Sequence, residues 1–168
     1  EPGSTEPDAS RCARDDGETL TIDFPNYHSG RNGDVQPVHM SGTIHPLMRN
    51  PGSASGRIEV FPSHPHEGAV GVPAGEARAR AVATGRSTVT GRDFDLVVAF
   101  DRTAAMPGRA IAESSFHHFA DYNWDIARGA PSFVTEAPGD AIQRKPALLD
   151  DVRAYVKNCV DWLAPNAA

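Results

Sequence analysis

Two short segments of this chain combine histidine with acidic or hydroxyl side chains at spacings that suit metal binding or acid–base catalysis. Residues 64–67 read His-Pro-His-Glu, directly after a predicted strand. In an extended segment, side chains two positions apart point the same way, so His64 and His66 face one target. Two imidazoles and one carboxylate form a suitable ligand set for a divalent metal such as zinc, manganese or iron. The sequence therefore predicts metal ligation by His64, His66 and Glu67, unless these side chains only hydrogen-bond the backbone of their own loop.

The second segment, residues 114–121, reads Ser-Ser-Phe-His-His-Phe-Ala-Asp and also follows a predicted strand. Open α/β sheets form ligand crevices at the carboxyl ends of their strands. Neighbouring residues point to opposite sides, so one of His117 and His118 faces the crevice and the other faces away. Imidazole titrates near neutral pH, which suits general acid–base work. We therefore expect His117 and Glu67 to be catalytic, and His118 and Asp121 to contact the ligand, with a core histidine bonded to backbone as the alternative.

A third polar loop spans residues 27–34 and reads Tyr-His-Ser-Gly-Arg-Asn-Gly-Asp. Its candidate ligand-binding residues are His28, Arg31 and Asp34, with Arg31 as an anion clamp and Asp34 as a ligand or base. Turn formation explains most of these residue types equally well, because Asn and Gly accept positive φ angles. The loop is therefore either a ligand contact or only a turn.

Other nucleophile patterns are weak. Ser114 and Ser115 do not lie in the G-x-S-x-G elbow of a serine hydrolase. The two cysteines, Cys12 and Cys159, lie in a polar arm and in a predicted helix, and their spacing leaves open whether they pair. No glycine loop matches a nucleotide-binding pattern.

Composition indicates one globular domain. The chain has 168 residues, of which 39% are hydrophobic and 23% are charged, so it can bury a core. A net charge of −6 with scattered basic residues argues against nucleic-acid binding. No apolar stretch is long enough for a membrane span, and no signal-peptide pattern is visible. We expect a soluble protein, with the cytoplasm slightly favoured over the periplasm or secretion.

The elements that must position these loops are mostly strands. Residues 1–17 are predicted to form a flexible acidic arm and residues 18–168 a single α/β domain, in which 95–100 is a strand covered on both faces. Apolar residues at helical spacing predict one strong helix over 147–163. Other strands are expected at 19–24, 35–40, 57–61, 77–84 (strand or short helix) and 109–116. One helix against five or six strands indicates a strand-rich fold or one with a part missing.

Several motifs resemble the second half of a ThuA-like domain, a branch of the class I glutamine amidotransferase superfamily. These motifs are residues 45–47 (His-Pro-Leu), 61–68, 108–118 and 160–164 (Val-Asp-Trp-Leu-Ala). The resemblance implies a flavodoxin-like α/β sheet, here its strand-rich C-terminal portion, completed by a missing N-terminal segment, a partner chain or a homo-oligomer.

The resemblance also implies a sugar-like or small polar ligand. It suggests hydrolysis or proton transfer on that ligand, assisted by a metal or by histidine. Glutamine hydrolysis is unlikely, because the family's F-H-P-E phrase continues here with His118 and Phe119, and no cysteine elbow is present. The alternatives are a binding module without turnover and a structural subunit of a larger assembly.

Overall fold

The computed structural model describes residues 27–130 and 136–164, except for the side chain of Asp121. The predicted acidic arm, the strand predicted at 19–24 and Cys12 lie outside these residues. Cys159 is a free thiol.

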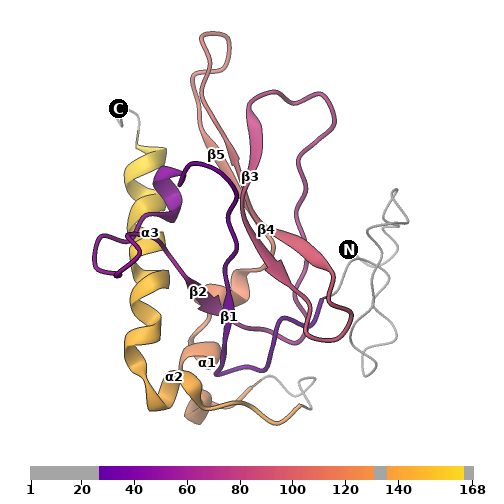
Figure 1. Cartoon of the computed structure of the whole chain (residues 1–168), viewed down its shortest axis with the longest axis vertical. Coiled ribbons are helices and arrows are strands. Elements are labelled where there is room, and N and C mark those ends of the chain that lie inside the picture. The colour runs from indigo at the N-terminus through magenta and orange to yellow at the C-terminus, as the bar shows by residue number, and fades with distance from the viewer. Residues whose placement is uncertain (1–26, 131–135, 165–168) are drawn as a thin grey trace.

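Two small antiparallel sheets form the framework. Strands β1 (Val35–Pro37) and β2 (Val60–Pro62) make the first sheet. Strands β3 (Ala79–Arg86), β4 (Asp93–Phe100) and β5 (Ala110–Glu113) make the second, in the order β3-β4-β5. Just after β1, the backbone of His39 exchanges hydrogen bonds of 2.8 and 2.9 Å with Thr84 of β3. This bridge places the two sheets edge to edge (Figure 1).

Strand β4 is the centre of the core. Its run Leu96-Val97-Val98-Ala99 has no exposed surface, which confirms the prediction of a strand covered on both faces. The segment predicted as strand or short helix forms β3, whose register shifts near Ala81 and Ala83 indicate a β-bulge. An alternating Ala/Val pattern suits a pleated, half-buried strand next to β4.

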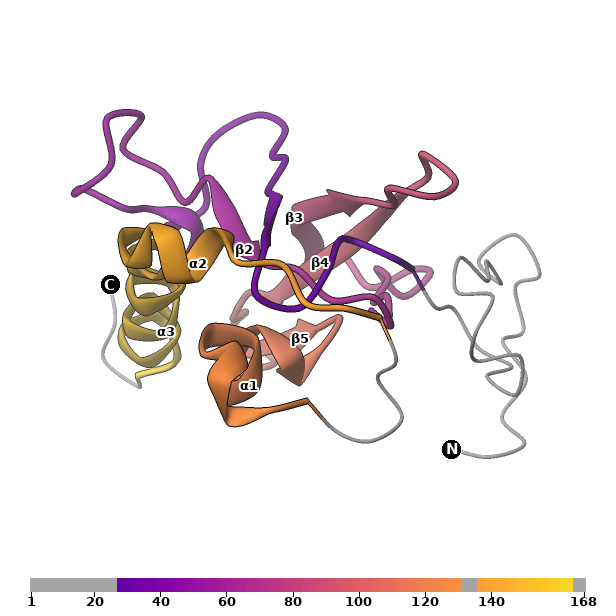
Figure 2. The same cartoon turned by 90° about the horizontal axis from the view of Figure 1, so that it is seen from below.

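Helix α3 (Leu149–Leu163) follows the 3₁₀ turn η5 (Pro146–Leu148) and matches the predicted helix closely. It buries Tyr155 and Trp162 in the core that contains β2 and the turn η2 (Pro46–Met48), whereas Leu149 and Val152 pack with Ile142 of the short helix before it. Figures 1 and 2 show it on the side of β2 that faces away from the larger sheet.

Asp151 fixes α3 in this position. Its carboxylate accepts hydrogen bonds from Asn50 Nδ2 at 2.6 Å and from the backbone N–H groups of Glu59 and Val60 at 2.9 and 3.0 Å. These bonds also satisfy backbone donors at the start of β2.

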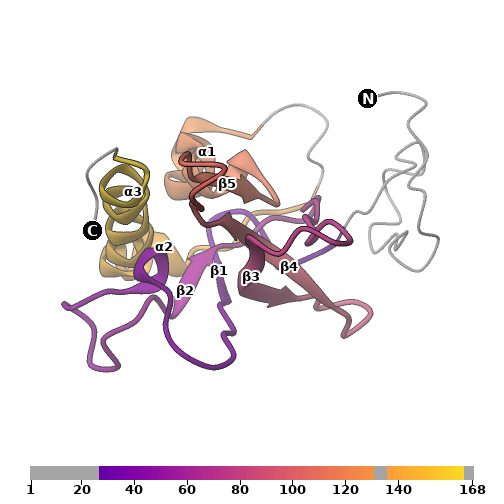
Figure 3. The same cartoon turned by 90° about the horizontal axis from the view of Figure 1, so that it is seen from above.

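Short helical turns fill the connection from β5 to α3. They are η3 (Phe116–Phe119), α1 (Asp121–Trp124), η4 (Ile126–Arg128) and α2 (Ala141–Arg144). Figures 2 and 3 show α1 beside β5, where it supports the turn that carries the histidine pair. These turns were not anticipated, because four-residue helices leave no periodic pattern in a sequence.

The fold is therefore of mixed α/β content, with two antiparallel sheets and a C-terminal helix. The pairings among the described strands are all antiparallel. Within the described part of the chain, no helix has the length and apolar character needed to span a membrane.

Candidate functional site

The two histidine loops leave strands of different sheets and pack against each other. The His64 loop follows β2, and the His117 turn follows β5. A side chain at Gly68 would place its Cβ only 2.6 Å from the carbonyl oxygen of Ser114, so glycine permits the close approach of the two loops.

The loop around His28 joins them through its backbone. Ser29 donates its N–H and its hydroxyl to the His64 carbonyl at 3.1 and 3.0 Å, and accepts the His64 N–H at 2.9 Å. Ser63 donates its hydroxyl to the Arg31 carbonyl at 2.6 Å. Gly30 has a φ of +147°, and a Cβ there would lie 2.8 Å from the Ser63 side chain. The three polar loops predicted from the sequence therefore meet at one place.

A directed chain of hydrogen bonds connects His64, Tyr122 and His117. The His66 N–H donates to His64 Nδ1 at 2.9 Å, so the proton of the neutral His64 ring is on Nε2. That Nε2–H faces the Tyr122 hydroxyl oxygen at 3.3 Å. The Tyr122 hydroxyl also hydrogen-bonds His117 Nδ1, and because its oxygen accepts from His64 we assign its own proton to this second bond. Consequently the proton of the neutral His117 ring is on Nε2, and the chain ends in an N–H donor.

The two rings of this chain are stacked and neutral. The centroids of His64 and His117 lie 3.7 Å apart with an interplanar angle of 12°. Burial, followed by the proximity of His117, lowers the pKa of His64 to about 2. Burial, followed by the proximity of His118, lowers the pKa of His117 to about 4. Both imidazoles are therefore uncharged at neutral pH.

Side chains of α1 and of the preceding turn hold the histidine pair in place. Ser115 caps η3 by accepting the His117 N–H at 3.1 Å. Asn123 donates its amide to the His117 carbonyl, and Trp124 donates its indole N–H to the His118 carbonyl at 2.7 Å. The conformation of η3 is therefore fixed from both ends.

We call the region of His117, Tyr122 and the stacked His64 ring the histidine face. Beneath it lies a buried polar network centred on Glu67. His118 Nε2 donates to Glu67 Oε1 at 2.7 Å, and both side chains are completely buried. Ser114 donates its hydroxyl to the same oxygen at 3.0 Å, and Gln36 of β1 donates its amide to Oε2 at 2.6 Å. As expected for adjacent residues, His118 faces this interior while His117 is only half-buried. Both oxygens of Glu67 are thereby occupied.

The residues predicted as metal ligands do not converge on one point. Glu67 is held by its buried partners, and His64 Nδ1 accepts the His66 N–H. In the described residues there is no group of three or more His, Cys, Asp or Glu side chains that could hold a metal ion. To join His64 and His66 on a metal, Glu67 would have to leave His118. Metal binding stays a prediction, which the metal content per chain of natively purified protein would test.

The remaining predicted ligand-binding residues bond to other parts of the chain and not to the histidine pair. His28 contacts Thr88 Oγ1 at 2.9 Å through Nδ1 and Glu136 Oε2 at 3.0 Å through Nε2. Arg31 pairs with Asp34 at 3.2 Å, and Asp34 Oδ1 accepts the backbone N–H at position 141. These bonds favour the turn interpretation for Arg31 and Asp34. Asp121 begins α1, but its side chain lies outside the described part.

Sequence reasoning missed Tyr122 and Gln36, which complete the two networks. Tyr122 lies five residues after His117, on a short helix without a sequence signature, and Gln36 lies in a three-residue strand. A polar residue at an inward position of a strand was the one available signal for Gln36.

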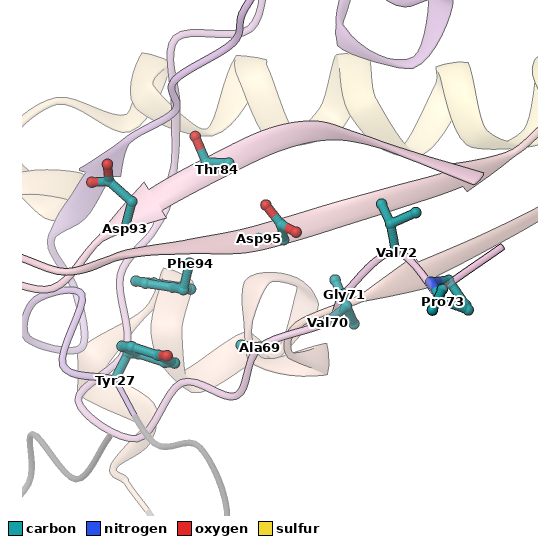
Figure 4. Close-up of a pocket in the computed structure, with 11 residues that line it drawn as sticks. Tyr27, Ala69, Val70, Gly71, Val72, Pro73, Thr84, Asp93, Phe94 and Asp95 are labelled. Carbon is teal, nitrogen blue, oxygen red and sulfur yellow. The ribbon is translucent and has the colours of Figure 1, made fainter. Parts of the chain in front are cut away.

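A separate cleft of about 800 Å³ lies beside β4. Figure 4 shows the rings of Tyr27 and Phe94 at one end of it, stacked with centroids 4.5 Å apart, and Asp93 and Asp95 along the strand. Asp93 is engaged with Arg86 at 2.8 Å. The cleft contains none of the histidines, so the histidine face and this cleft are different places on the molecule.

Comparison with known proteins gives no family for the chain: no family model matches it, and no curated protein or solved structure matches it.

The lowered pKa values give a direct prediction. In a pH titration followed by NMR of the imidazole nitrogens, His64 and His117 should remain neutral from pH 8 down to about pH 5, with the proton on Nε2 of each ring. In the Tyr122→Phe variant the neutral His117 ring should populate both tautomers, because the hydroxyl that donates to Nδ1 is lost. If His117 titrated near its ordinary pKa, the stacked neutral pair would be refuted.

Proposed function

We propose that the surface around His117 and Tyr122, supported from behind by the buried His64 ring, binds a small polar ligand, with the Nε2–H of the neutral His117 ring as a hydrogen-bond donor to a ligand oxygen. The observation that supports this proposal is the series of hydrogen bonds that runs from the His66 N–H through the His64 ring and the Tyr122 hydroxyl to the His117 ring. No hydrogen bond to His117 Nε2 is formed by the described residues, so this donor is available. Such a chain pre-organises one ring in one tautomer.

The same geometry defines what chemistry the site can perform. A neutral histidine N–H that is already oriented can polarise a ligand carbonyl or stabilise developing negative charge on oxygen. The alternative role as a general base requires a lone pair on His117 Nε2. That in turn requires Tyr122 to turn its hydroxyl proton away from Nδ1. The arrangement therefore supports donor chemistry or binding more strongly than proton abstraction.

An exposed aromatic ring beside the donor bears on the ligand class. Phe116 is 71% exposed, and its ring centroid lies 4.1 Å from that of His117. A ligand with a C–H face next to hydroxyl oxygens, such as a sugar or cyclic polyol, can contact Phe116 while accepting from His117. This agrees with the sugar-like ligand that the ThuA-like resemblance implies.

The test is an NMR titration of the full chain with glucose, galactose and inositol, followed at the His117 Nε2–H resonance and, so that His117→Ala can be compared, at the backbone amide resonances of residues 114–124. We expect a saturable shift with at least one of them, and a loss of affinity of about tenfold in His117→Ala, the amount associated with one good hydrogen bond to a ligand. His39→Ala is the matched control, because His39 is an exposed histidine outside this face.

Parallel assays with p-nitrophenyl glycosides separate the two versions of the proposal. Turnover that is lost in His117→Ala supports an enzyme, and saturable binding without turnover supports a binding module. No saturable shift with any of these compounds, or an equal loss in the His39 control, would overturn the proposal.

We also propose, from the resemblance, that the chain is part of a flavodoxin-like domain completed by an N-terminal segment, a partner chain or a second copy. The mixed α/β content is compatible with this proposal. A native mass of the purified chain and of longer versions of the protein would test it.

A further inference from the structure

A small cavity outside the histidine face contains a buried donor that lacks an acceptor. The cavity has a volume of about 200 Å³ and lies between the chain before η2 and strand β3. Its polar lining side chains are Ser41, Thr43, His45 and Arg80. None of them belongs to the site described above.

The tautomer of His45 is fixed by the turn that it begins. His45 Nδ1 accepts the Leu47 N–H at 3.2 Å, as the cap of η2. The neutral ring therefore carries its proton on Nε2. This atom is buried and finds no hydrogen-bond partner among the described residues, and His45 as a whole is only 4% exposed. Because buried donors in folded proteins are almost always paired, this one calls for an acceptor other than the described residues, and a bound ligand would supply it.

The charges around His45 favour a negative acceptor. Burial, followed by the charge of Arg80, lowers the pKa of His45 to about 4, and Arg109 and Arg49 act in the same direction. Only Asp101 opposes them, and it lies 3.4 Å from Arg80 at the surface. Arg109 is held in place by a bond of 2.8 Å to the Trp162 carbonyl and by its position over the Trp162 ring. Three positive charges, of which that of Arg109 is held in place, against one negative charge make this region electropositive.

We propose that this cavity is a binding site for a small oxyanion, a phosphate or carboxylate group, held by the His45 Nε2–H and the Arg80 guanidinium. The volume corresponds to about seven water molecules at the density of the liquid, enough for a phosphate group or a short carboxylic acid but too small for a nucleotide. Charged hydrogen bonds from a guanidinium and an oriented N–H are the usual means of holding such groups.

The experiment is a titration of the full chain with inorganic phosphate and, separately, with acetate, at constant ionic strength made up with sodium chloride. The His45 Nε2–H resonance reports the site directly, and the backbone amide resonances of residues 41–47 report binding in the variant that lacks His45. We expect a saturable shift with at least one of the two anions, and the two titrations distinguish a phosphate site from a carboxylate site. Arg80→Gln should weaken the affinity by about tenfold, as expected for a charged hydrogen bond.

Arg86→Gln is the matched control. Arg86 lies on the same strand, is exposed to a similar degree and is likewise paired with an aspartate, Asp93. His45→Asn keeps a side-chain acceptor for the Leu47 N–H but removes the Nε2 donor, so it should also weaken binding. Three results would overturn the proposal: no saturable shift with either anion, equal losses in Arg80→Gln and Arg86→Gln, or full affinity in a folded His45→Asn variant.

Discussion

Replacing Glu67 by alanine should destabilise the fold by about 3–5 kcal/mol, because it leaves several buried donors without their acceptor and opens a cavity. The carboxylate accepts from His118, Ser114 and Gln36, and none of these donors reaches another acceptor of comparable geometry. Its removal leaves buried donors unpaired and opens a cavity between the two histidine loops. Urea denaturation at pH 7 measures the loss.

Two further variants test whether the loss of stability comes from the buried carboxylate of Glu67 itself. Glu67→Gln keeps the volume but turns one acceptor oxygen into a donor, so its loss should be intermediate. Glu59→Ala removes an exposed glutamate and should change the free energy of unfolding by less than about 0.5 kcal/mol. Equal stability of the Glu67→Ala variant and the wild type would show that the buried network contributes nothing.

The second large effect that we expect is a pH dependence of the free energy of unfolding, which originates at Glu113. This residue of β5 accepts the Tyr155 hydroxyl proton, and its other oxygen is buried without a partner. Burial, followed by the proximity of Glu67, raises the pKa of Glu113 from 4.5 to about 8. The folded chain therefore binds a proton here that the unfolded chain has released, so stability is lost as the pH rises from about 5 through 8.

The neutral variant Glu113→Gln should remove this dependence. Between pH 6.5 and 8 the wild type should lose about 1.6 kcal/mol in total relative to the variant, with a slope that falls from about 1.3 to about 0.7 kcal/mol per pH unit as the pH reaches the pKa of Glu113. In this window His64 and His117 are already neutral, so they add no slope. Denaturation curves of both proteins at pH 6.5, 7.2 and 8 measure the difference, and parallel stabilities would contradict a buried, protonated Glu113.

Regular elements could be predicted from the sequence because their signals are local. The continuous apolar run of β4 and the helical spacing of α3 each reflect burial on a fixed period, and the structure has both. The ends were less certain: β2 begins at Val60, three residues later than predicted, because Asp151 takes the backbone N–H groups of Glu59 and Val60.

The orientation of loop side chains could not be predicted in this way. The sequence predicts that residues 64–67 form one extended segment whose side chains share a common target. Instead His64 accepts the N–H of His66, and Glu67 forms a backbone bridge with Tyr27 and turns its carboxylate inward. Hydrogen bonds within a loop depend on distant partners such as Gln36 and Tyr122, and no periodic pattern in the sequence identifies them.

The buried network around Glu67 also bears on how the chain reaches its folded state. Its three hydrogen bonds join residues 31, 47 and 51 positions apart in the sequence. Each contact closes a long loop, and a half-assembled network would hold desolvated polar groups without partners, so the bonds must form nearly together. High contact order of this kind slows folding, and the shared dependence of β1, β2 and β5 on one carboxylate makes their unfolding cooperative.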